Sequence, residues 1–92
     1  MSKPVVLFAC VHNSGRSVAA RAALGAEHSR IRRQFMRDGD LRVRRAAVHA
    51  ALARPVPEDS TDLAEAARLD PDPLVRSLAV QALGTLGKAP AV

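Results

Sequence analysis

The sequence predicts a mainly α-helical fold, in which helical hairpin repeats follow one strand–loop–helix segment. The first observation is an internal repeat at an offset of 32 residues, where seven of the thirteen positions from 38 to 50 are identical to positions 70 to 82. The second is the composition, which is 48% hydrophobic but only 2% aromatic, as expected of closely packed alanine-rich helices. The third is that only one segment, residues 4–9, has the pattern of a strand.

The N-terminal segment, residues 1–26, is expected to form an incomplete domain of strand, loop and helix. The apolar strand at 4–9 leads into a polar loop, and a helix is expected over 17–26. Residues 16–22 also match residues 76–82 in pattern, with Arg, Ser, Ala and Ala at shared positions. This helix is therefore also compatible with an additional, degenerate unit stacked on the repeats.

Residues 27–92 are expected to contain two hairpin repeats, with helices near 29–37, 41–53, 61–69 and 73–86. Asp38-Gly39 and Asp70-Pro71 are the predicted turns, and Asp40 and Asp72 are the predicted N-caps of the helices that follow. Pro73 stands at a first helical position, where its missing N–H costs nothing. The N-cap candidates of the helix at 61–69 are Asp59, Ser60 and Thr61. One apolar stripe runs along the last helix: Val75, Leu78, Ala79, Ala82, Leu83 and Leu86.

Charge is distributed unevenly along a chain whose formal net charge is +5. The count is +5 over residues 26–54 and −3 over residues 55–92, which indicates a polar array or an acidic partner. The basic cluster is expected to be a solvated helix face: Arg30, Arg32, Arg33, Arg37, Arg42, Arg44 and Arg45. Nucleic-acid backbone binding ranks below protein binding, because aromatic side chains for base stacking are scarce.

A single cysteine excludes an intrachain disulfide, and no stretch is long enough to span a membrane. A cytoplasmic location is the default expectation, and no metal site is expected. The most specific pattern is Cys10-x5-Arg16-Ser17 after the apolar run. A thiol and a guanidinium at this spacing can meet at the ends of a tight loop, whose backbone N–H groups and following helix favour a bound oxyanion. The oxyanion-binding candidates are Val11, His12, Asn13, Ser14, Gly15, Arg16 and Ser17.

Residues 3–24, KPVVLFACVHNSGRSVAARAAL, resemble the opening of the low-molecular-weight protein tyrosine phosphatase and arsenate reductase superfamily. The residues flanking Ser14, Val11-His12-Asn13 and Gly15-Arg16-Ser17, are closer to the arsenate reductases. The resemblance implies that Cys10 is the catalytic nucleophile and Arg16 the bidentate clamp on arsenate, phosphate or sulfate. It also implies that Asn13 braces the loop and that Ser17 donates a hydrogen bond to the sulfur.

The resemblance to this superfamily covers about a quarter of the chain, so a truncated or fused form is implied. Only one strand candidate is present, and the repeat explains Asp70-Pro71 and Asp72-Pro73, the candidates for the superfamily's acid. With one cysteine and no cofactor, arsenate reduction would need an external thiol or a redox protein. Whether the segment is active as a reductase or as a phosphatase is open at this point.

Residues 28–87 resemble short HEAT-like repeats through the block Asp-x-Asp-x-x-Val-Arg-x-x-Ala-Val-x-Ala. This resemblance implies an α-solenoid that acts as a scaffold for protein–protein interaction. It also implies that Arg44 and Arg76 bind Asp38, Asp70 or carbonyls at helix ends, in a polar ladder between repeats. Two functions therefore stand side by side: a thiol-based oxyanion protein, and a repeat scaffold whose N-terminal motif no longer works.

Overall fold

The computed structural model describes residues 14–88. Helix makes up 82% of this part, and none of it is strand, which confirms the predicted mainly α-helical class. Five α-helices follow one another in this part, labelled α2 to α6, with two 3₁₀ turns between them. None of these helices is both long and apolar enough to cross a lipid bilayer.

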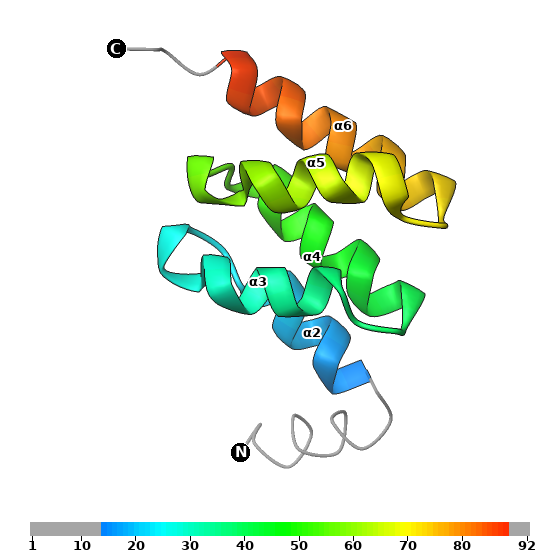
Figure 1. Cartoon of the computed structure of the whole chain (residues 1–92). Coiled ribbons are helices and arrows are strands. Elements are labelled where there is room, and N and C mark those ends of the chain that lie inside the picture. Colours follow the sequence, from blue (N-terminus) through cyan, green and yellow to red (C-terminus); the bar gives the residue numbers. More distant parts are fainter. Residues whose placement is uncertain (1–13, 89–92) are drawn as a thin grey trace.

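The helices form two layers, with α2, α4 and α6 in one layer and α3 and α5 in the other (Figure 1). α4 (Leu41–Ala53) lies between α2 (Ser14–Ala22) and α6 (Pro73–Lys88) and contacts both. α3 (Ser29–Met36) packs on α4, and α5 (Ser60–Leu69) packs on α6. Two helical hairpins, α3–α4 and α5–α6, are thus stacked side by side, with α2 against the first of them.

The hairpin turns and caps agree closely with the repeat. The carboxylate of Asp40 accepts the backbone N–H of Arg42 at 2.8 Å, so Asp40 caps α4 as predicted. The carboxylate of Asp72 accepts the backbone N–H of Val75 at 2.9 Å, at the start of α6. Two 3₁₀ turns, Ala26–His28 and Pro57–Asp59, lead into α3 and α5.

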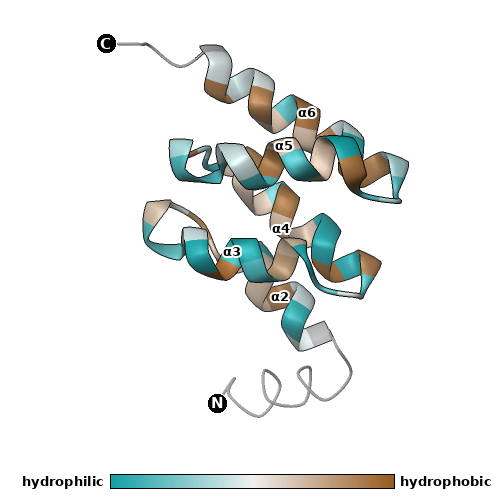
Figure 2. Cartoon of the chain, viewed as in Figure 1, coloured by the Kyte–Doolittle hydropathy of each residue, from teal (hydrophilic) through white to brown (hydrophobic). Residues whose placement is uncertain are grey.

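The core lies between the two layers and is built mainly from alanine and valine. Val43, Leu63 and Val75 are fully buried, and alanines from α2, α4 and α6 let the helices approach closely. Apolar and polar residues alternate along each helix in Figure 2, as expected of amphipathic helices with one buried side. Because small residues at the contacts let the helices pack closely, the core is filled with few aromatic side chains.

The first described helix differs from the prediction at both ends. α2 begins at Ser14 rather than at residue 17, and it ends at Ala22 rather than at residue 26. The chain leaves the helix before Gly25, whose φ of 85° falls in the left-handed region that glycine tolerates best. A Cβ at Gly25 would lie 2.7 Å from the Glu27 carboxylate, so this turn favours glycine. The predicted strand, residues 4–9, lies outside the described residues.

Candidate functional site

The two hairpin turns have the same polar architecture. The Asp38 carboxylate accepts the backbone N–H of Asp40 at 2.8 Å, and the Asp70 carboxylate accepts that of Asp72 at 2.9 Å. Each turn is therefore closed by its first aspartate, which leaves the second carboxylate oxygen for another donor. The two turns lie at the same edge of the molecule (Figure 1).

Arg44 connects these two turns. Its Nη1 donates to the backbone carbonyls of Asp38 and Gly39 at 3.0 and 3.1 Å, within its own hairpin. Its Nε donates to Asp70 Oδ2, in the turn of the next hairpin, at 3.0 Å. One guanidinium thus holds both turns in register, which is the polar ladder that the repeat resemblance implies.

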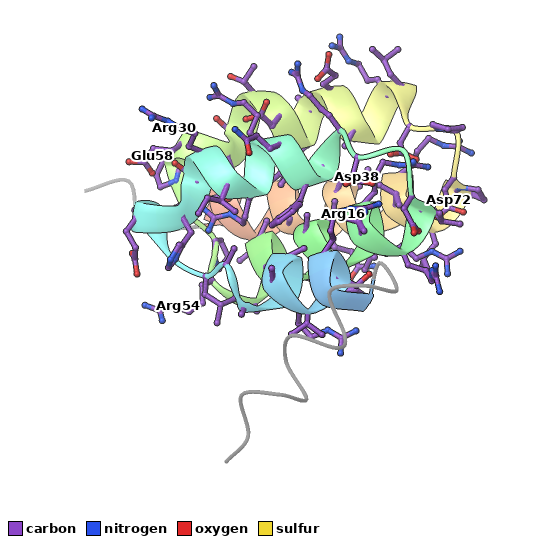
Figure 3. The ribbon with its side chains drawn as sticks, turned by 90° about the horizontal axis from the view of Figure 1, so that it is seen from below. Arg16, Arg30, Asp38, Arg54, Glu58 and Asp72 are labelled. Atoms are coloured by element: carbon purple, nitrogen blue, oxygen red, sulfur yellow. The ribbon has the colours of Figure 1, made fainter. Side chains whose placement is uncertain are left out.

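Arg16 makes the equivalent contact one step earlier. Its Nε donates to Asp38 Oδ2 at 2.9 Å, and its Nη2 lies 3.3 Å from Asp38 Oδ1. Figure 3 shows the two side chains meeting, Arg16 from α2 and Asp38 from the α3–α4 turn. Arg16 on α2 therefore does for the first turn what Arg44 on α4 does for the second. We call the contacts of Arg16, Arg44 and Arg76 with these turns the ladder.

The structure describes only part of the predicted oxyanion loop. Ser14, Gly15, Arg16 and Ser17 lie in the first turn of α2 rather than in a loop, and Gly15 is buried. Cys10, Val11, His12 and Asn13 lie outside the described residues. The predicted clamp and the predicted nucleophile are therefore not placed relative to each other, while Arg16 is placed on Asp38.

One sequence signal for this contact was missed. Cys10 and Arg16 have the same spacing as Asp38 and Arg44, and as Asp70 and Arg76. Offsets of 28 and 60 residues, applied to the N-terminal segment, align the Cys-x5-Arg motif with the Asp-x5-Arg of the first and of the second hairpin. The arginine of the motif is thus in register with the ladder, and the cysteine stands where the hairpins have an aspartate.

A second polar cluster is buried at the opposite ends of the helices. Arg32 is fully buried, and its Nε donates to Asp59 Oδ2 at 2.8 Å. Its Nη1 donates to the carbonyls of Ala23 and Gly25 at 2.9 and 2.6 Å, and its Nη2 has no partner among the described residues. Asp59 was predicted as an N-cap of α5, but its side chain caps nothing and pairs with Arg32 instead.

The basic cluster is partly solvated, as predicted, since Arg30, Arg33, Arg37 and Arg42 are exposed, but most of its arginines also take part in stacking. Five of its seven arginines bind acidic residues of the second hairpin, so much of the basic middle of the chain is neutralised by its own acidic end. Arg42 pairs instead with Asp40 of its own hairpin, and Arg30 is exposed. The inter-hairpin pairs are Arg32–Asp59, Arg33–Asp62, Arg37–Asp62, Arg37–Glu65, Arg44–Asp70 and Arg45–Asp72.

Three turn carboxylates have depressed pKa values. The backbone N–H of Asp40 and then the Arg16 guanidinium hold the pKa of Asp38 below its ordinary 3.8, against the opposing effect of partial burial. The side chain and backbone N–H of Arg42 lower the pKa of Asp40. The Arg45 side chain, followed by the backbone N–H of Val75, lowers the pKa of Asp72.

Acid is therefore expected to destabilise the fold through these turns. A carboxyl whose folded pKa is depressed contributes stability that is present above its unfolded pKa, about 4, and that is lost as the pH falls through the folded value. We expect the melting temperature to fall as the pH is lowered below about 4. In Asp72→Asn, the acid-induced drop should be smaller than in the parent. An equal drop in both chains would contradict a role for this turn.

The described residues contain no group of three or more His, Cys, Asp or Glu side chains arranged to hold a metal ion. The polar groups that the described residues bring together are mainly ion pairs between neighbouring helices and turns. Comparison of the chain with protein-family models, with characterised proteins and with solved structures gave no match.

Proposed function

We propose that the chain is a HEAT-like helical-repeat module whose role is to bind another protein. The observation that carries this proposal is the ladder, in which Arg16 binds Asp38 as Arg44 binds Asp70. It supports α2 as a further unit of the array rather than the first helix of a phosphatase domain. Stacked helical hairpins form extended surfaces, and such surfaces are suited to binding other proteins.

Nucleic-acid backbone binding is not favoured by these contacts. Five of the seven arginines in the basic cluster bind acidic residues of the second hairpin, and Arg42 binds Asp40. A phosphate would have to displace a carboxylate from each of them. The positive charge of the basic cluster is therefore largely neutralised by acidic side chains of the same chain.

A thiol-based oxyanion protein is the second candidate, favoured by the Cys10-x5-Arg16-Ser17 motif alone. In that mechanism the Cys10 thiolate attacks arsenate, an As–S bond forms and an oxygen leaves as water. An external thiol then attacks the Cys10 sulfur, and the electron pair of the As–S bond passes to arsenic. Arsenite leaves, and a mixed disulfide remains for a second thiol to reduce. Arg16 would have to exchange Asp38 for the oxyanion.

Alkylation of Cys10 by iodoacetamide distinguishes the two candidates. If Arg16 is a ladder residue, we expect the rate to be the same with and without arsenate, phosphate or sulfate. The matched variant is Asp38→Asn, which keeps an acceptor for the turn but removes the charge that competes for Arg16. In this variant too, the repeat module predicts no protection of the thiol.

Protection of Cys10 by an oxyanion would overturn the repeat-module assignment for this segment. Stronger protection in Asp38→Asn than in the parent would show that Asp38 and the oxyanion compete for Arg16. Arg16→Ala, which removes the clamp, should abolish any such protection. A rate that oxyanions leave unchanged in all three chains is the expected result.

A further inference from the structure

The second hairpin has one flank that no described helix covers. α4 has α2 on one side and α6 on the other, whereas α6 has α4 on one side only among the described helices. Four α6 residues on this flank, spaced as neighbours on one helix face, are exposed, and we call them the open face: Pro73, Ser77, Val80 and Gly84.

The repeat shows what normally covers these positions. The equivalents of the open face on α4 are buried or half-buried: Leu41, Arg45, Val48 and Leu52. Val48 is 0% exposed and its equivalent Val80 is 57% exposed. Since Val80 is exposed although α4 lies beside α6, this position points away from α4. On α4 the same position therefore points toward α6, the next helix of the layer.

The ladder is incomplete at the same place. Arg76 repeats the first part of the Arg44 arrangement, because its Nη1 donates to the carbonyls of Asp70 and Pro71 at 2.8 and 3.2 Å. The Nε of Arg44 goes on to bind the aspartate of the following turn. For the Nε of Arg76, residues 14–88 supply no carboxylate. An uncovered valine and an unused guanidinium edge thus lie one helical turn apart.

We propose that the open face docks a helical hairpin of a partner protein that carries an Asp-x-Asp turn. The first aspartate of that turn binds Arg76 Nε, as Asp70 binds Arg44, and an apolar stripe on the following helix covers Val80, as α6 covers Val48. This inference rests on the proposed repeat module and names the class of partner. Charge and apolar contact are both specified, because two earlier steps of the array show the charged contact and the Val48 position shows the apolar one.

A second copy of this chain fits the open face less well. Stacked head to tail, it would bring α2 against α6. Where the hairpins have Asp38-Gly39-Asp40, the sequence ahead of α2 has Cys10-Val11-His12. A copy in this orientation would therefore give Arg76 no aspartate at the ladder position.

The test tethers a hairpin of the stated chemistry to the full chain. The probe is a copy of residues 55–88 in which Asp62→Asn and Glu65→Gln remove the carboxylates that would meet Glu65 of the chain's own α5. It is attached after Val92 through a glycine–serine linker of roughly 20 residues, which sets an effective concentration near the millimolar range. The reporter is Val80→Cys in a Cys10→Ser background, and the measurement is the alkylation rate of its thiol. We expect the tethered hairpin to slow alkylation roughly tenfold or more, because the covered thiol reacts only when the contact opens.

Two control variants separate specific docking from crowding. The first is Leu74→Cys, an exposed α6 position whose equivalent Arg42 is also exposed, and its rate should not change. The second is Asp70→Asn within the tethered copy only, which keeps the turn acceptor and removes the charge meant for Arg76. This change should restore most of the reactivity at position 80.

Two results would overturn the inference. One is an alkylation rate at position 80 that the tethered hairpin does not alter. The other is protection of position 80 in the untethered chain that rises with protein concentration, together with a dimer in sedimentation, since the occupant would then be a second copy. Either result would leave the Cys10 experiment unaffected, so failure here is distinguishable from failure of the proposed repeat module.

Discussion

Replacing Asp59 with alanine is expected to destabilise the fold by about 3–5 kcal/mol, because the fully buried Arg32 then keeps its charge without a counter-ion. A domain of this size has a total stability of about 5–10 kcal/mol, so the variant should lose a large share of it and melt well below the parent. Urea denaturation followed by circular dichroism measures the loss.

The neighbouring residue Glu58 provides the control for Asp59→Ala. Glu58 is exposed, so Glu58→Ala should change stability by less than about 0.5 kcal/mol. Changing both members of the buried pair, as Arg32→Met with Asp59→Leu, should recover part of the loss, since no unpaired charge remains. Recovery should be incomplete, because the carbonyls of Ala23 and Gly25 lose their donor. A single variant Asp59→Ala as stable as Glu58→Ala would contradict the importance of this pair.

Leu78→Ala is expected to cost about 2–5 kcal/mol, since Leu78 is only 6% exposed and belongs to the core cluster between α6 and its neighbours. The alanine leaves a cavity that the closely packed helices fill only in part. Thermal unfolding should show a large drop in melting temperature.

Leu74→Ala, on the same helix, is the matched comparison for Leu78→Ala. Leu74 is 43% exposed, so the same truncation should cost well under half as much. Equal melting temperatures for the two variants would mean that α6 does not pack through the stripe that the sequence predicts.

The repeat made the two hairpins predictable from sequence. The helix predicted at 41–53 is α4, and the caps at Asp40 and Asp72 form the expected hydrogen bonds. These features are local, because a cap or an apolar stripe depends on residues a few positions apart. The ladder is longer in range, and its two hairpin members were implied by the repeat resemblance.

The buried Arg32–Asp59 pair could not be predicted in the same way. The repeat equivalent of Arg32 is Ala64, so periodicity gives no signal, and Arg32 stands in an arginine-rich run that resembles a solvated face. Its burial depends on how the α2–α3 connection and the turn before α5 meet in space. The start of α2 at Ser14 was missed because Ser14 to Arg16 were assigned to a loop.

The inter-hairpin ion pairs also determine the order in which the hairpins stack. At the turns, both hairpins carry Asp-x-Asp, so the turns alone would accept either hairpin. Between α3 and α5 the signs differ, because Arg33 and Arg37 face Asp62 and Glu65. A first hairpin placed in the second position would present Arg30 and Arg33 there, and like charges would repel. The turns thus give alignment to the array and the α3–α5 contacts give it direction, which disfavours assemblies in which the two hairpins exchange places.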